Sequence, residues 1–281
     1  MLGSIIATVS GIGYSLRLSF LKDLKKYNFG KSTINFYYRV LSLPLIIIMM
    51  LLINEKIVLN NPKFLIIFVI SLFLNVIYTL YQVFVYQRSQ FSNVESFSFL
   101  EIIFSTLLAL IFFKQVLQIK EIVGIMTIVF GLLILTVKKT KIGDVRELVQ
   151  IVFYYLIYSL VHNFNQQATY LSSPITYALL TTIGLVVANF VIMLINHNDL
   201  NYKISKGAFS ILAITGFLTA LSFIGSTYSY KLLPVGIAVT LFDTKVFFSL
   251  WLSHKKYGEK NLGHKVFASV LAFIGVIILF L

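Results

Sequence analysis

The chain of 281 residues contains no cysteine, one tryptophan, four prolines and only ten acidic residues. The absence of cysteine excludes disulfide bonds and cysteine-ligated metal sites. Charged residues of both signs make up 12% of the chain, whereas a soluble protein of this size carries about twice that share. No hydrophilic stretch is long enough for a soluble domain. Any chemistry is therefore expected within a membrane or at its surface.

Apolar residues dominate instead, at 58% of the chain, and they fall into ten long stretches. A helix needs about twenty residues to cross a hydrocarbon core about 30 Å thick. The expected spans are residues 2–21, 33–53, 64–87, 92–113, 120–137, 148–171, 174–195, 207–230, 234–254 and 263–281. The sequence therefore predicts an all-α integral membrane protein with ten transmembrane helices.

The second five spans repeat the placement of the first five at an offset of 144 residues. Seven identical pairs align without a gap: Tyr86 with Tyr230, Phe104 with Phe248, Ser105 with Ser249, Leu108 with Leu252, Gly131 with Gly275, Ile134 with Ile278 and Leu135 with Leu279. Because five crossings are an odd number, a second copy must enter the bilayer upside down. We expect two inverted five-helix repeats, residues 1–143 and 144–281, as in many secondary transporters. Chance agreement among spans of similar length is the alternative.

The net charge of +13 lies almost entirely in loops between the apolar spans. Three loops carry four basic residues each: Lys22, Lys25, Lys26 and Lys31; Lys138, Lys139, Lys141 and Arg146; Lys255, Lys256, Lys260 and Lys265. Anionic lipid headgroups and orientation signals explain such clusters. No basic soluble segment with interleaved aromatic residues is present, so we expect the lipid bilayer, and no nucleic acid, as partner.

Four ionisable residues fall inside expected spans: Glu95 and Glu101 in span four, and Asp243 and Lys245 in span nine. A charge near the bilayer centre costs about 2.5–3.5 kcal/mol, so it usually faces a partner, a cavity or a pathway. The offset makes Glu101 and Lys245 equivalent, near the middle of their spans. Either Glu101 attracts a cation or proton and Lys245 an anion, which suits a zwitterion such as an amino acid, or Lys245 pairs with one of the three carboxylates.

Two arginines lie nearer the ends of spans. Arg39, about six residues into span two, either snorkels or bonds to a neighbouring helix, or it reaches inward as a counter-ion to Glu101 or Glu95. Arg17, near the end of span one, is expected to anchor that end at the membrane interface.

Span six carries a polar run at residues 162–167. His162 and Gln166 share one helix face, and Asn163 and Gln167 share another. These side chains either bind a polar solute, or end the span and bond to neighbouring helices. The four histidines show no HxxxH or HExxH spacing, so we expect no metal site, and no cofactor is indicated.

Aromatic residues are abundant, with 26 phenylalanines and 16 tyrosines. Tyr78 and Tyr81 in span three are our candidates for the wall of a cavity. An aromatic wall suits apolar amino acids, drugs or quaternary amines through stacking and cation–π contacts. The alternative is that these rings face lipid or form interfacial belts.

Several short motifs together resemble one known family. They are Gly11-Ile12-Gly13-Tyr14 in span one, Arg39 in span two, Gly124 and Gly131 in span five, Tyr257-Gly258-Glu259-Lys260 with Leu262 after span nine, and Gly275 in span ten. With ten spans in two halves, the whole chain resembles the EamA-type members of the drug/metabolite transporter superfamily. It departs from them at Lys114-Gln115, where the repeat would place a second Gly-Glu, and at Ile102 and Val246, where the family often has proline.

The resemblance implies a secondary transporter, an exporter or exchanger of a small polar or amphipathic metabolite such as an amino acid or amine. It would work by alternating access around a central cavity, with proton coupling or exchange, in the cytoplasmic membrane of a bacterium or archaeon. A homodimer is left open. The inverted repeat, the charges inside spans and the absence of a GxxxxGK[ST] sequence agree with a carrier.

The alternative is a membrane-embedded lipid-handling protein, either flippase-like or an enzyme. Such an enzyme would need a nucleophile, a metal cluster or a set of carboxylates at one rim of the membrane. Glu259, His254, His264 and His197 match no catalytic spacing. We therefore expect no enzyme and no catalytic residue.

Orientation in the membrane is indicated in two opposite ways. Fifteen of the 23 lysines and arginines lie in loops that follow odd-numbered spans. The positive-inside rule places these loops in the cytoplasm and both termini outside. The family resemblance implies both termini inside. We expect the charge distribution of this chain to decide.

Overall fold

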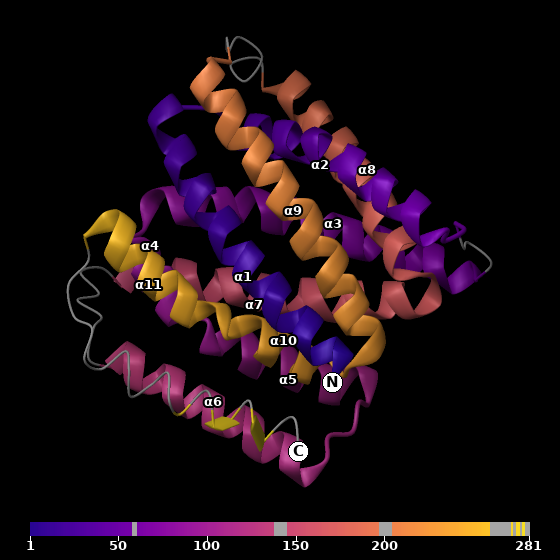
Figure 1. The fold of residues 1–281 in the computed structure, drawn as a ribbon, viewed down its shortest axis with the longest axis vertical. Coiled ribbons are helices and arrows are strands. Elements are labelled where there is room, and N and C mark those ends of the chain that lie inside the picture. The colour runs from indigo at the N-terminus through magenta and orange to yellow at the C-terminus, as the bar shows by residue number, and fades with distance from the viewer. Residues whose placement is uncertain are drawn as a thin grey trace.

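The computed structural model describes residues 1–57, 61–137, 145–196 and 204–258, together with residues 271, 274, 275, 277 and 278. All regular elements in this part of the chain are helices, and it contains no strand. The elements are α1 (Leu2–Asp23), the 3-10 helix η1 (Leu24–Tyr27), α2 (Lys31–Ile53), α3 (Pro62–Arg88), α4 (Phe91–Ser96), α5 (Phe99–Phe113), α6 (Ile119–Val137), α7 (Val145–Leu171), α8 (Pro174–Ile195), α9 (Lys206–Leu232), α10 (Val235–Asp243) and α11 (Lys245–Tyr257) (Figure 1).

Helix starts follow from local sequence. Pro62 and Pro174 occupy the first turns of α3 and α8. Backbone N–H groups in a first turn have no acceptor within the helix, so the N–H that proline lacks costs no hydrogen bond there. The side chains of Asn61 and Ser173 cap these helices by accepting hydrogen bonds from backbone amides of the first turn. These local signals explain why both helices begin close to the predicted residues.

Seven segments of the described chain are long and apolar enough to cross a membrane: Leu2–Tyr27, Lys31–Ile53, Pro62–Arg88, Phe91–Phe113, Pro174–Ile195, Lys206–Leu232 and Val235–Lys256. The structure therefore fits an integral membrane protein. Helices α6 and α7 lie at expected spans five and six but are not among the seven, and the polar run of α7 lowers its hydropathy. Span ten, Glu259 and Leu262 fall mostly or wholly outside the described residues, so the count of ten stays a prediction.

The helix bounds recur along the chain. The starts of α3 and α9, the starts of α4 and α10, and the ends of α5 and α11 are each 144 residues apart. Packing recurs too: α1 packs against α9 as α7 packs against α3, and α2 packs against its own counterpart α8. A pseudo-two-fold relation between the halves would produce this exchange of partners. Their inversion relative to a membrane stays a prediction.

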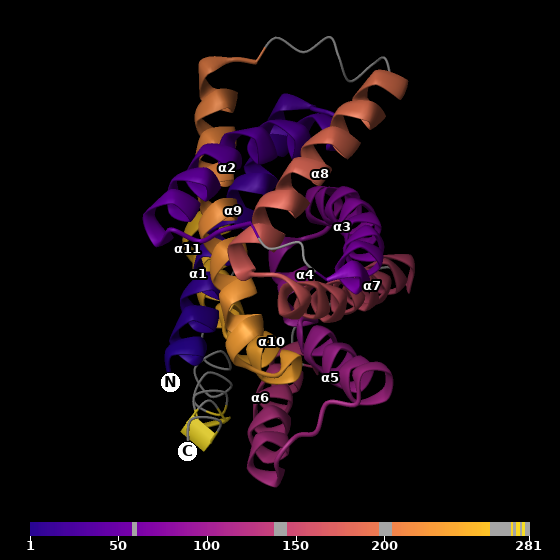
Figure 2. The same cartoon turned by 90° about the vertical axis from the view of Figure 1, so that its right-hand side faces the viewer.

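The core lies where α1 packs against helices of the second half of the chain. Figure 1 shows α1 running alongside α9, with α2 and α8 toward one end of the molecule and α6 at the other. Figure 2, turned by 90°, shows α5 and α6 at the end opposite the last turns of α8. Helix α1 also approaches α10 closely at Gly11, where a Cβ atom would overlap the carbonyl oxygen of Phe242.

Spans four and nine are each interrupted near the middle. Between α4 and α5, the amide of Ser98 bonds to the carbonyl of Glu95 at 3.2 Å. Between α10 and α11, the amide of Thr244 bonds to the carbonyl of Leu241 at 3.3 Å. Bonds to the third residue back are those of a 3-10 turn, which often marks a hinge within a helix. Both interruptions form without a proline.

Candidate functional site

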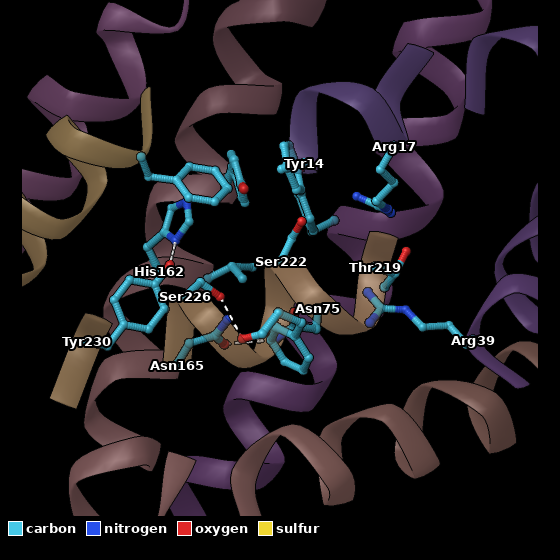
Figure 3. A pocket seen from close by; sticks show the side chains of 15 residues that line it. Tyr14, Arg17, Arg39, Asn75, His162, Asn165, Thr219, Ser222, Ser226 and Tyr230 are labelled. Atoms are coloured by element: carbon cyan, nitrogen blue, oxygen red, sulfur yellow. Dashed lines mark hydrogen bonds between the residues drawn. The ribbon is translucent and has the colours of Figure 1, made fainter. Parts of the chain in front are cut away.

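A cavity lies at the centre of the molecule, between helices of both halves of the chain. It is lined by Tyr14, Arg17, Arg39, Asn75, Tyr78, Tyr158, Val161, His162, Asn165, Thr219, Ser222, Phe223, Ser226, Tyr230 and Phe242 (Figure 3). These residues belong to α1, α2, α3, α7, α9 and α10. The empty space, including the open part, is about 470 Å³.

Tyrosines form one wall of this cavity. The rings of Tyr78 and Tyr158 stack with centroids 4.3 Å apart and planes 5° from parallel. The hydroxyls of Tyr14 and Tyr78 bond to each other, and Gln82 donates to the hydroxyl of Tyr78 at 2.6 Å. The wall is therefore held in place by its own polar atoms. Tyr81 does not line the cavity, because its hydroxyl donates to the backbone of Gln150 at 3.4 Å.

Arg17 is buried in the protein core, with 2% of its surface exposed, so the prediction that it anchors the helix end at the membrane interface is wrong. Its Nη2 donates to the hydroxyl of Tyr38 and to Oε1 of Gln82, each at 2.9 Å. Helix α1 continues for six more residues to Asp23, so Arg17 lies more than a turn below the helix end. Buried neutral acceptors on α2 and α3 hold it there.

Arg39 is also buried, at 6% exposure, and lines the cavity. Its guanidinium carbon lies 5.4 Å from the ring centroid of Tyr38 and 5.6 Å from that of Phe223. It neither snorkels nor forms an ion pair with Glu101 or Glu95 among the described residues. Those carboxylates have other partners, which leaves Arg39 facing the cavity.

Glu101 and Lys245 approach each other as the offset predicts. Nζ of Lys245 lies 3.7 Å from Oε2 of Glu101 and also pairs with Asp243. Nε2 of His162 lies 2.6 Å from Oε1 of Glu101, and Nδ1 bonds to the hydroxyl of Tyr230. All four charged or titratable side chains are at most 3% exposed. In this state Lys245 forms ion pairs with Glu101 and Asp243. Of the four side chains in this cluster, only His162 lines the cavity.

Glu95 belongs to a separate polar network. It accepts hydrogen bonds from the hydroxyl of Tyr86 and, at 2.8 Å, from Ser249. Ser249 bonds in turn to Ser15 at 2.6 Å. The network joins α4 to α11 and α1, and Glu95 does not line the cavity.

The polar run of α7 divides between two roles. His162 lines the cavity, whereas Asn163 donates to the carbonyl of Ser105 at 3.1 Å and Gln166 to that of Leu233 at 2.8 Å. The last two side chains therefore connect helices in this structure. Helix-to-helix bonding was the second interpretation of this run.

Sequence reasoning missed most of the polar lining. The missed residues include Asn75, Asn165, Thr219, Ser222 and Ser226. The last three follow one another on α9 at spacings of three and four, which places small hydroxyls on one helix face. That periodicity was the available signal. Asn165 lay within the predicted polar run of α7, but nothing distinguished it from the four other polar residues of that run.

Comparison with known proteins gives the family. Residues 1–137 match the model of the EamA-like transporter family. Among 28 matching chains of solved structures, one titled "Crystal structure of protein" superposes with a TM-score of 0.72 at 12% identity, covering 97% of this chain and 96% of that one. That likeness shows the fold alone. The search of curated proteins gave no match. Residues 1–137 therefore belong to the EamA-like transporter family of the drug/metabolite transporter superfamily, whose members are generally solute transporters.

Proposed function

We propose that the protein is a secondary transporter that carries a small polar or amphipathic metabolite by alternating access around the central cavity. One observation carries the proposal: six helices, three from each half of the chain, supply the lining. A site between two halves is contacted by both as they move, so it can open first to one side and then to the other.

Two features of the helices support this mechanism. The interruptions of spans four and nine provide places at which each span can bend. The recurrence of helix bounds at 144 residues agrees with ten spans in two inverted repeats, which we keep as part of the proposal. Inversion would make the two end states of the cycle similar in energy, since the halves exchange roles.

We also propose that protons drive the transport, in exchange for the solute. At formal charges, Glu101, Asp243 and Lys245 together carry one excess negative charge, which a single proton balances. His162 lies between this cluster and the cavity. His162 also contacts the hydroxyl of Tyr230 on α9 and the ring of Tyr158. Lys245, which pairs with Asp243 at the break between α10 and α11, lies 3.7 Å from Glu101 on the other side of the cluster. Bound solute and bound proton thus act on neighbouring groups.

Counterflow in proteoliposomes tests the transporter proposal. Ser226 lines the cavity and Ser210 is exposed on the same helix α9. Ser226→Leu fills the cavity and should lower counterflow of a transported solute at least about tenfold, because the leucine occupies space the solute needs. Ser210→Leu is the matched control and should transport normally. Equal activity of both variants would contradict the proposal, and lipid flipping or turnover in the same vesicles, without counterflow, would favour the lipid-handling alternative.

A further inference from the structure

We propose that the solute carries an oxyanion, such as a carboxylate, and that Arg17 and Arg39 bind it together at one end of the cavity. The inference rests on the proposed function and names the solute class for the same site. The two arginines, and not Lys245, are then the anion-binding groups, because Lys245 pairs with Asp243 and Glu101.

Among the described residues, the two guanidinium groups have no anionic partner. None of the ion pairs among the described residues involves Arg17 or Arg39. Nε of Arg17, and Nε and Nη1 of Arg39, are buried without a hydrogen-bond partner in this part of the chain. A cation removed from water is destabilising unless an anion and hydrogen bonds compensate it. An incoming oxyanion supplies both.

The buried carboxylates cannot take this role where they stand. Glu101 and Asp243 contact Lys245, and Glu95 accepts from Tyr86 and Ser249. They equal Arg17, Arg39 and Lys245 in number, but Coulomb attraction falls with distance, so the nearest groups dominate. Among the described residues that line the cavity, two are arginines and none is acidic.

The shape of the site matches the chemistry of an amphipathic oxyanion. Figure 3 shows Arg17 and Arg39 on one side of the cavity and His162 and Tyr230 on the other. A planar guanidinium donates two parallel hydrogen bonds to a carboxylate or phosphate-like group. The rest of the solute would lie against the tyrosine wall. A simple amine would find no acidic side chain on the described lining.

A charge series on one skeleton tests the inference with the wild-type chain. The probes are 3-phenylpropionate, phenylalanine, phenethylamine and 3-phenylpropionamide, measured by thermal stabilisation of the purified protein. We expect the two carboxylates to stabilise it at concentrations at least about tenfold below those needed for the amine and the amide. Phenylphosphonate, added as a fifth probe, distinguishes a phosphate-like preference from a carboxylate preference. Equal stabilisation by all probes, or none by the oxyanions, would overturn the inference.

Arginine variants then locate the binding group. Arg39→Gln should weaken binding of 3-phenylpropionate about tenfold or more. Arg39→Lys should recover part of the lost affinity, because lysine restores the positive charge but cannot donate the two parallel hydrogen bonds of a guanidinium. Arg88→Gln, at the exposed end of α3, is the matched control and should bind as wild type. Unchanged binding by Arg39→Gln and Arg17→Gln would contradict the assignment.

Transport separates this inference from the proposed function. Phenethylamine or the amide could show counterflow as fast as the carboxylates, and Ser226→Leu could still block it. That result would reject the oxyanion inference but leave the transporter proposal standing. Absence of counterflow for every solute in a broad screen would reject the transporter, and with it the inference.

Discussion

Glu101 and Lys245 lie 144 residues apart, the offset at which the helix bounds recur, yet their surroundings differ. Glu101 contacts both His162 and Lys245, whereas Lys245 bonds to Asp243, two residues before it. The side chains of the cluster are at most 3% exposed, so each charge depends on its neighbours. Of these groups His162 alone lines the cavity. In our proposal, proton coupling and solute binding are therefore assigned to different side chains.

Glu101→Gln should abolish accumulation driven by a proton gradient while leaving solute counterflow within about twofold of wild type. The amide keeps the shape of the side chain and can still bond to His162, but it cannot bind a proton at neutral pH. Proteoliposomes with and without a pH gradient give both rates. Glu147→Gln, in the first turn of α7, is the matched control. Loss of counterflow together with accumulation would show that Glu101 serves binding or folding instead.

The double variant with exchanged charges, Glu101→Lys with Lys245→Glu, should transport far more slowly than the wild type. The new carboxylate at position 245 would lie beside Asp243, and like charges in a buried site repel strongly. Adding Asp243→Asn removes that repulsion and should raise the rate above that of the double variant. Counterflow of all three proteins checks the order. Recovery above about half of the wild-type rate by the double variant alone would show that Asp243 is no obstacle.

Helix α1 packs against α9 and α10 and supplies Tyr14 and Arg17 to the cavity. Small residues permit this close packing, which in membranes replaces the hydrophobic drive between helices. Gly11 meets the backbone of α10, whereas Gly13 meets only the hydroxyl of Ser222, 2.9 Å from the place of a Cβ atom. A backbone cannot move aside as a serine can.

Gly11→Ala should therefore destabilise the protein and lower transport at least about tenfold, although alanine favours helix by about 1 kcal/mol. Gly13→Ala gains the same helix propensity and should cost little, since Ser222 can change rotamer. Thermal unfolding in detergent and counterflow compare the pair. If both variants behave alike, the close approach of α1 and α10 does not limit function.

For the whole molecule, orientation decides which end of the cavity faces the cytoplasm. The basic residues gather in loops after odd-numbered spans, including η1 and the residues after it. Loops of the opposite end, such as the α5–α6 connection, carry few. A short loop rich in lysine is retained on the cytoplasmic side during insertion.

Cysteine labelling tests this orientation cleanly because the chain has no cysteine of its own. Lys25 and Val116 are both exposed and lie in loops of opposite parity. In intact cells an impermeant thiol reagent should label Val116→Cys and not Lys25→Cys, which should react only after permeabilisation. The cysteine-free wild type is the control. The reverse labelling pattern would place both termini in the cytoplasm, as the family resemblance implies.

The sequence by itself determined the membrane class, the helical fold and the approximate ends of most helices. Hydropathy, proline and capping residues act over one segment at a time, so a single chain displays them. The approach of Glu101 to Lys245 also followed, because the repeat offset relates positions far apart in the chain. These are properties of segments and of their order.

Tertiary structure alone decided which polar side chains share the cavity. A helix can present any face to its neighbours, and that rotation depends on packing with segments distant in sequence. Arg17 therefore lies inside where its place near a span end suggested the interface, and Asn165 lines the cavity while Asn163 joins α7 to α5. Lys245 is bound by Asp243 and Glu101, which leaves the two arginines as the cations of the site.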